Sequence, residues 1–335
     1  GAVYTANGAI ATINTSTFKG NYVVNDGYGG AIYAGDSTMT INNSIFGGKG
    51  DGEGNIARAG GAIAFNPTIN TGSGSLTING SDFINNHATY TGGAIYQAGG
   101  TLTINGSLFD GNSAENESNG GAISSFGSGK LIIDGSKFLN NTSSGTGVGS
   151  SELNGHNGDG GAIYTSSAYE TTITNSYFEN NIAVNSSNSN DGGAVILYGT
   201  KADISDTEFY ANKAENGSGG AAYIATNTST WNRVNFIDNE ALNRGDGGAI
   251  NFEIENTRTA EINDSKFYGN KSAKTGGAIY NGITLTLNNV IFGGEGDGKG
   301  NTSVSNGGAI NSNGALTING AQFINNTATS TETST

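Results

Sequence analysis

The sequence predicts an all-β fold: a right-handed, single-stranded parallel β-helix, a solenoid of the pectate-lyase kind, with about eleven rungs. Three features of the 335-residue chain lead to this prediction. A Gly-Gly-Ala triplet recurs ten times at intervals of 27 to 40 residues, a Phe follows each triplet, and a short apolar-polar-apolar segment precedes each Phe. Repeats of this length are typical of solenoids, in which each repeat buries its apolar side chains against its neighbours.

The first predicted strand of each repeat reads Gly-Ala-Ile-Tyr. It begins at the triplet, and a shortened copy, Gly1-Ala2-Val3-Tyr4, opens the chain. The triplets start at Gly29, Gly60, Gly92, Gly120, Gly160, Gly192, Gly219, Gly247, Gly276 and Gly307.

The second predicted strand reads Leu-Thr-Ile-Asn, with its Ile five residues before the Phe in most repeats. Apolar and polar residues alternate over three to five positions, which is the period of a half-buried strand. Asn-Gly pairs such as Asn79-Gly80 and Asn105-Gly106 follow it, and Asn-Gly favours a turn. We therefore expect a corner between the second strand and the third.

The third predicted strand reads Phe-x-x-Asn-x-Ala, and Asn stands three residues after Phe in nine of the eleven repeats. Stacking would place Phe on Phe inside the rod and Asn on Asn at its corners. At ~4.8 Å per rung, eleven rungs would form a rod roughly 50 Å long. The expected ladder residues include Phe83, Phe109, Phe138, Phe178, Asn86, Asn112, Asn141 and Asn181.

Composition limits the function. The net charge is −14, and the 14 Lys and Arg residues are scattered, which argues against nucleic acid and anionic lipid as partners. The chain has no Cys, so disulfides are excluded, and no run of 18 apolar residues that would span a membrane directly. We expect one β-helix domain over residues 1–328 and a Thr/Ser-rich tail or linker over 329–335.

The Gly-Gly-Ala-Ile and Phe-x-x-Asn motifs resemble the repeats of the chlamydial polymorphic outer membrane proteins. They are also similar to repeats of adhesin-like surface proteins of methanogenic archaea, whose Asn/Ser/Thr-rich composition the chain shares more closely. The chain departs from the chlamydial family in lacking Cys and a translocator domain. The resemblance implies an extracellular, cell-surface location and a role in adhesion, and it implies no catalytic residues.

Two surfaces are candidates for ligand binding. Tyr follows the inward Ile in several first strands and is expected to face outward, where it could stack on sugar rings or simply contact its neighbours along the rod. The longest loop, Thr142–Asp159, contains His156, and variable loops of repeat proteins often carry recognition. The candidate ligand-binding residues are Tyr33, Tyr96, Tyr164, Tyr280 and His156.

Two near-duplicate loops alternate Gly with carboxylates and replace Phe-x-x-Asn. One carries Asp51 and Glu53, and the other carries Glu295 and Asp297. Oxygen ligands of this kind suit calcium, so calcium is a possible cofactor; flexible Gly-rich turns are the alternative.

Catalysis is not expected. The outward carboxylates Asp203 and Glu261 fall two rungs apart, ~10 Å, near the upper limit for a pair that hydrolyses glycosides with inversion. No nucleophile motif or phosphate loop is present. Sequons at Asn116, Asn185 and Asn216 are candidate glycosylation sites, which would make the protein a glycoprotein.

The leading functional prediction is an extracellular adhesin-like protein that attaches to a glycan or a surface protein through its repeat surface or variable loops. The alternative is a structural subunit of a surface fibre or layer, an end-to-end homopolymer formed by stacking of uncapped β-helix ends, since the sequence begins and ends inside repeats. A carbohydrate-active enzyme is the third possibility.

Overall fold

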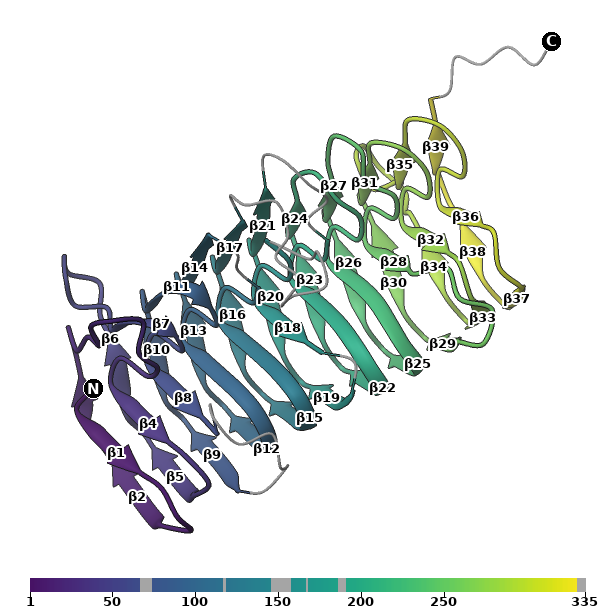
Figure 1. The fold of residues 1–335 in the computed structure, drawn as a ribbon. Coiled ribbons are helices and arrows are strands. Elements are labelled where there is room, and N and C mark those ends of the chain that lie inside the picture. The colour runs from purple at the N-terminus through teal and green to yellow at the C-terminus, as the bar shows by residue number, and fades with distance from the viewer. Residues whose placement is uncertain (67–73, 117–118, 146–157, 167, 186–190, 330–335) are drawn as a thin grey trace.

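The computed structural model describes residues 1–66, 74–116, 119–145, 158–166, 168–185 and 191–329, and within these ranges it contains strands and turns without helices. The chain winds into a rod of stacked parallel strands, with its first and last described strands at opposite ends (Figure 1). Every named strand pairing is parallel, and the strands form three sheets that run the length of the rod. The predicted parallel β-helix is confirmed.

Sheet A, with 18 strands, combines the first and second predicted strands of the repeats. Its strands in chain order are β1 (Val3–Thr5), β2 (Ile10–Asn14), β4 (Ile32–Ala34), β5 (Thr38–Asn42), β8 (Ile63–Phe65), β9 (Ser75–Asn79), β12 (Ile95–Asn105), β15 (Ile123–Asp134), β18 (Ile163–Thr165), β19 (Ala168–Thr174), β22 (Val195–Ser205), β25 (Ala222–Asn232), β28 (Ile250–Phe252), β29 (Thr259–Asn263), β32 (Ile279–Asn281), β33 (Thr284–Asn288), β36 (Ile310–Ser312) and β37 (Leu316–Asn319).

Sheet B, with 11 strands, carries the repeated Phe. Its strands are β3 (Thr17–Phe18), β6 (Ile45–Gly47), β10 (Asp82–Ile84), β13 (Leu108–Asp110), β16 (Lys137–Leu139), β20 (Tyr177–Glu179), β23 (Glu208–Tyr210), β26 (Asn235–Ile237), β30 (Lys266–Tyr268), β34 (Ile291–Phe292) and β38 (Gln322–Phe323).

Sheet C, with 10 strands, carries small inward residues, mostly Ala and Ser. Its strands are β7 (Ile56–Ala59), β11 (His87–Thr91), β14 (Ser113–Asn116), β17 (Thr142–Gly145), β21 (Ile182–Asn185), β24 (Lys213–Ala214), β27 (Glu240–Ala241), β31 (Lys271–Ser272), β35 (Thr302–Ser303) and β39 (Thr327–Ala328).

The division of a repeat into strands differs from the prediction in two ways. In β12, β15, β22 and β25 the first and second predicted strands are one strand of 11 or 12 residues, because the segment between them also pairs with the neighbouring rung. The third predicted strand is two strands in two sheets, since the chain turns within it. A single residue makes this turn: Asn85 has φ 53° and Ala211 has φ 53°.

The predicted Asn-Gly corner between sheets A and B is confirmed. Gly80 and Gly106 adopt φ 54° and 55°, in the left-handed region that glycine tolerates without strain. In other rungs Asn43, Asn175 and Asn289 take the same place with φ 48°, 50° and 55°, and Asn is the residue that best follows glycine there.

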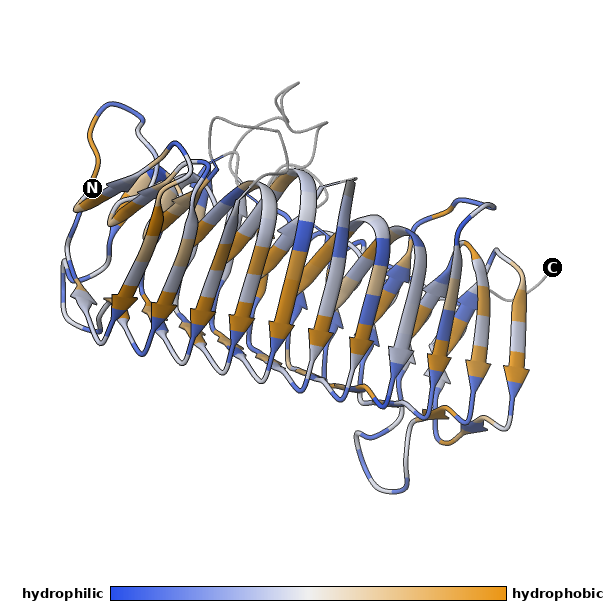
Figure 2. Ribbon diagram, turned by 90° about the horizontal axis from the view of Figure 1, so that it is seen from below, coloured by the Kyte–Doolittle hydropathy of each residue, from blue (hydrophilic) through white to orange (hydrophobic). Residues whose placement is uncertain are grey.

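The core of the rod is a column of stacked side chains. The eleven repeated Phe rings form ten successive contacts with centroids 4.7 to 5.1 Å apart and interplanar angles of 2° to 13°. The inward Ile and Leu residues of sheet A pack against this column and are mostly fully buried. Figure 2 shows the apolar bands recurring at matching positions along successive strands. The predicted Phe ladder, including Phe83, Phe109, Phe138 and Phe178, is present.

A ladder of buried Asn side chains runs along the corner between sheets B and C. Every Asn except the last donates from its Nδ2 to the Oδ1 of the Asn in the next rung, at 2.8 to 3.0 Å. The predicted Asn ladder is therefore also present. Its members are Asn21, Asn55, Asn86, Asn112, Asn141, Asn181, Asn212, Asn239, Asn270, Asn301 and Asn326.

Candidate functional site

A row of aromatic side chains lies along the outer side of sheet A, close to the Gly-Gly-Ala corners. Successive centroids are 5.2 to 6.2 Å apart and the rings are tilted by 34° to 56°. Tilted arrangements at this spacing are favourable for aromatic pairs. The members of this outer aromatic row are Tyr28, Tyr96, Phe126, Tyr164, Tyr198 and Tyr223.

The four Tyr residues that were candidates for ligand binding have different surroundings. Tyr164 lies on the outer side of sheet A as expected, but it is only 5% exposed because it packs between Phe126 and Tyr198, and burial raises its pKa. Tyr33 stacks on the ring of Tyr4 at 5.0 Å.

Tyr280 is partly exposed, and its hydroxyl accepts a hydrogen bond from Asn313 at 2.7 Å. Of these four Tyr residues, only Tyr96 lines the pocket of about 180 Å³ that opens in the outer aromatic row.

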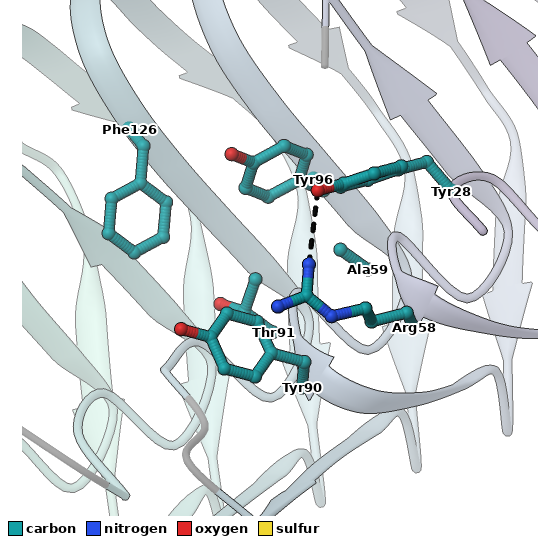
Figure 3. Close-up of a pocket in the computed structure, with 7 residues that line it drawn as sticks. All are labelled: Tyr28, Arg58, Ala59, Tyr90, Thr91, Tyr96 and Phe126. Carbon is teal, nitrogen blue, oxygen red and sulfur yellow. Dashed lines mark hydrogen bonds between the residues drawn. The ribbon is translucent and has the colours of Figure 1, made fainter. Parts of the chain in front are cut away.

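Next to Tyr96 the outer aromatic row is hollowed into a pocket of about 180 Å³. Four aromatic rings surround the pocket, one of them that of Tyr96. The side chain of Arg58 extends into the pocket (Figure 3). We call this cavity the Arg58 pocket. Its lining residues are Tyr28, Arg58, Ala59, Tyr90, Thr91, Tyr96 and Phe126.

Small residues in the strand register make room for this pocket. Tyr96 of β12 pairs with Ala64 on one side and with Ser124 on the other, so no large side chain stands directly beside its ring. The neighbouring rings instead come from other positions: Tyr28 approaches from the corner of an earlier rung, and Phe126 lies two residues beyond Ser124. The rings are therefore displaced along the strands, which opens space between them.

A β-bulge in sheet C sets the position of Tyr90. Ala57 pairs with Ala88, and Ala59 pairs with Thr91, so β11 holds one residue more than β7 between these points. Bulges of this kind redirect side chains. Here the Tyr90 ring comes to lie 4.3 Å from the Cζ of Arg58, within the range of a cation–π contact.

The guanidinium of Arg58 is held at three points. It faces the ring of Tyr90, it lies 6.0 Å from the ring of Tyr28, and its Nη1 donates a hydrogen bond to the Tyr28 hydroxyl at 3.1 Å. The buried setting of the site raises the pKa of Tyr96 to about 12, mainly through desolvation, so this hydroxyl is neutral at physiological pH.

Sequence reasoning identified Tyr96 but missed Tyr28, Arg58 and Tyr90. A usable signal was present: Tyr28 and Tyr90 precede a Gly-Gly-Ala triplet by one and two residues, and Arg58 precedes one by two. Residues at equivalent distances from a repeated motif meet at one place on a solenoid, because equivalent positions stack.

The two Gly-rich carboxylate loops lie far apart. They follow β6 and β34, and seven strands of sheet B separate these two. Glu53 accepts hydrogen bonds from the Lys19 ammonium and the Gly50 amide, and both interactions lower its pKa. Asp51, Glu295 and Asp297 are exposed.

The described part of the chain contains no group of three His, Asp or Glu side chains placed to hold a metal ion. Each Gly-rich loop thus presents one pair of carboxylates, and in the first loop a Lys already neutralises one of them.

The carboxylates that sequence reasoning considered for catalysis are engaged in surface interactions. Asp203 pairs with Lys201 at 2.6 Å, and Glu261 accepts a hydrogen bond from Asn288 at 2.8 Å. Nearby, Arg233 makes two hydrogen bonds of 2.7 Å to Asp206, three residues after Asp203. Asp203 and Glu261 lie two rungs apart, as predicted, with Thr230 in the rung between them.

The remaining predicted positions lie on the loop edge. His156 falls outside the described residues, as does the side chain of Asn185. Asn116 is exposed and its Nδ2 donates to the Thr89 carbonyl at 2.9 Å, while the Oδ1 of Asn216 accepts from Asn243 at 2.8 Å.

Comparison with protein families gives one match. Residues 15–35, 80–98, 106–125, 135–166 and 264–282 match the Chlamydia polymorphic membrane protein repeat, about a third of the chain in total. Each matched segment includes a Phe strand of sheet B and the next Gly-Gly-Ala corner. The match supports repeats like those of the polymorphic membrane proteins, a family associated with the outer membrane and the surface.

No curated protein and no solved structure is significantly similar to the chain. Within the described residues, no helix is long and apolar enough to cross a membrane.

Proposed function

We propose that the protein is an extracellular, cell-surface adhesin-like protein that attaches to a glycan or to another surface protein without catalysing a reaction. The observation that carries this proposal is the match of five segments to the polymorphic membrane protein repeat. The finer resemblance to adhesin-like proteins of methanogenic archaea, based on motifs and composition, belongs to the same proposal.

The rod supports this role physically. Its stability comes from the inner Phe column and the buried Asn ladder, so the outer surface can vary without disturbing the fold. A long, stiff surface can carry several separate binding positions and display them away from the layer to which the rod is attached.

The outer aromatic row and the Arg58 pocket are the strongest candidate for the binding surface. Exposed or half-exposed aromatic rings next to a few placed polar groups are a common arrangement in ligand sites. Four of the pocket's lining residues supply rings, and one supplies a positive charge in a chain whose net charge is −14.

Attachment is tested with purified protein on fluorescent beads. The beads would be applied to plates coated with polysaccharides, with surface glycoproteins, or with albumin as the control. Saturable retention on one coating, competed by soluble protein, is the expected result. Retention no greater than on albumin for every coating would count against the adhesin proposal, and release of reducing or unsaturated sugar ends would favour an enzyme instead.

A further inference from the structure

Within the part of the chain that the structure describes, Arg58 is a cation without an anionic partner, in a protein whose net charge is −14. Among the described residues its side chain forms one hydrogen bond, to the Tyr28 hydroxyl, and no ion pair. By contrast, Arg233 pairs with Asp206 and Arg258 pairs with Glu253. A guanidinium has five N–H donors, so most of the donors of Arg58 are available to a ligand.

We propose that the Arg58 pocket binds a carboxylated sugar, a pyranose ring bearing one carboxylate, as the acidic residue of a glycan. This inference rests on the proposed attachment function and specifies its ligand. Arg58 would hold the carboxylate through paired N–H donors, a geometry that a planar guanidinium provides and an ammonium does not.

The aromatic walls fix the position of the cation before a ligand arrives. Tyr90 lies 4.3 Å from the Arg58 Cζ, and the Tyr28 hydroxyl accepts from Nη1. Figure 3 shows the guanidinium between these two side chains, with Tyr96 and Phe126 lining the same pocket. Because the cation is already oriented, little side-chain entropy is lost when a carboxylate binds.

The same walls offer a platform for a sugar ring. The centroids of Tyr96 and Phe126 are 5.9 Å apart and both rings line the pocket. Within the described residues the Tyr96 hydroxyl has no hydrogen-bond partner, although desolvation raises its pKa to about 12. Apolar faces of sugars stack on such rings, and a neutral hydroxyl beside them can donate to a sugar oxygen.

The size of the pocket limits the ligand to one ring. Its volume of about 180 Å³ is below the roughly 300–1,000 Å³ of sites that enclose drug-sized molecules. The pocket therefore suits one residue of a glycan, with the rest of the chain extending across the rod surface. A neutral sugar would leave the donors of Arg58 without a charged acceptor, which favours the carboxylated form.

Binding would be measured by ligand-observed saturation-transfer NMR with the intact protein. The probes are methyl glucuronide and the methyl glycoside of sialic acid as two sources of a carboxylated pyranose, methyl glucoside as the neutral ring, and acetate as the bare anion. We expect at least one carboxylated sugar to bind about tenfold or more tightly than both methyl glucoside and acetate.

Variants identify the pocket. Arg58→Gln is expected to lower the affinity for the carboxylated sugar by about tenfold or more, whereas Arg58→Lys should retain part of that affinity. Tyr90→Ala should weaken binding of the sugar, and Tyr90→Phe should not. Arg233→Gln, which removes an Arg already paired with Asp206, is the matched control and should bind as the wild type does. Circular dichroism of each variant shows whether the fold persists.

Three results would overturn the inference: equal binding of methyl glucuronide, the sialic acid glycoside and methyl glucoside; binding of acetate as tight as that of the sugars; or equal affinities of the Arg58→Gln and Arg233→Gln variants. The bead assay separates this inference from the proposed function. If wild-type and Arg58→Gln beads attach equally well, the adhesin proposal stands and the pocket assignment fails.

Discussion

The side-chain amide of Asn86 connects three successive rungs: its Nδ2 donates to the Oδ1 of Asn112 in the next rung and to the carbonyl of Phe46 in the previous one, both at 3.0 Å. The backbone N–H of Asn86 also donates to Asn112 Oδ1 at 3.0 Å. Each buried Asn of the ladder therefore satisfies polar groups that would otherwise be unpaired inside the rod.

Replacing one ladder Asn by an apolar residue should be strongly destabilising. In Asn112→Leu the backbone N–H of Asn86 and the carbonyl of Phe83 lose the side chain that they bind, and the Nδ2 of Asn86 keeps only its bond to Phe46. Each buried polar group left unpaired costs about 1–3 kcal/mol. We expect a loss of about 3–5 kcal/mol in the free energy of unfolding, measured by urea denaturation.

The control for this change is Asn105→Ala. Asn105 belongs to a half-buried row on the corner between sheets A and B, where its Nδ2 donates to Asn79 at 2.9 Å and water can replace the lost bond. A loss below about 1 kcal/mol is expected there. Equal losses in the two variants would contradict the role assigned to the buried ladder.

The Phe column should be sensitive to cavities. Phe109 is fully buried and stacks on Phe83 and Phe138 at 4.7 and 4.8 Å. We expect Phe109→Ala to lower the free energy of unfolding by about 3–5 kcal/mol, because it removes a ring and leaves a cavity between two others. Its neighbour Leu108 faces outward and is half-buried, so Leu108→Ala should cost much less. A smaller effect at Phe109 than at Leu108 in thermal unfolding would refute the inward orientation of the ring.

The second glycine of each triplet is required for close packing of backbones. A Cβ at Gly93 would lie 2.0 Å from the carbonyl oxygen of Gly121 and 2.5 Å from that of Ser113. Gly93→Ala is therefore expected to destabilise the fold by about 3 kcal/mol or more.

Gly106 provides the contrast, because a Cβ there would meet nothing within 4 Å although φ is +55°. Asn occupies the equivalent corner at residues 43, 175 and 289, so Gly106→Asn should be nearly neutral. A large loss of stability in Gly106→Asn, comparable to that in Gly93→Ala, would mean that space at the corner and not backbone conformation decides this position.

The outer aromatic row predicts a loss of stability at high pH. Burial raises the pKa of Tyr96 from an ordinary value near 10 to about 12, and it also raises the pKa values of Tyr164, Tyr198 and Tyr223. A raised folded-state pKa means that the folded protein holds the proton more tightly than the unfolded chain does.

The stabilisation from Tyr96 is therefore complete below about pH 10 and is lost as the pH rises toward 12. Unfolding midpoints measured from pH 8 to 12 should fall above pH 10. Tyr96→Phe, which cannot ionise, should fall less steeply than the wild type. A midpoint that stays constant over this range would contradict the burial of the row.

Much of the fold could be predicted because the repeat places each motif residue on its counterpart. The Phe and Asn ladders follow directly from constant spacing within the repeats. The strand boundaries could not be predicted, because one residue turns the chain between sheets B and C and its identity varies: Asn85 and Ala211 adopt the same φ of 53°.

The pocket was harder to predict than the ladders. It combines side chains from separate rungs and depends on a bulge between Ala88 and Thr91 that moves Tyr90 toward Arg58. The sequence shows one residue more between Asn86 and Gly92 than between Asn55 and Gly60, but not where the strand takes up the extra residue. The outward Tyr row was predicted, but the burial of Tyr164 was not, because it depends on rings that approach from neighbouring rungs.

The central claim is that each repeat is one rung, with its motif residues in register with those of the next. Disulfide formation tests this directly, because the chain has no Cys of its own. Asp82 and Leu108 are register partners in β10 and β13, and both face outward. Adjacent parallel strands are ~4.8 Å apart, which permits a disulfide.

The double variant Asp82→Cys/Leu108→Cys should form an intramolecular disulfide under mild oxidation, detected by mass spectrometry. In the control, Asp82→Cys with Lys137→Cys, the second position lies one rung further on, next to Leu108, and should remain reduced. Reduced thiols in the first variant, or equal cross-linking in both, would contradict the register on which the ladders and the Arg58 pocket depend.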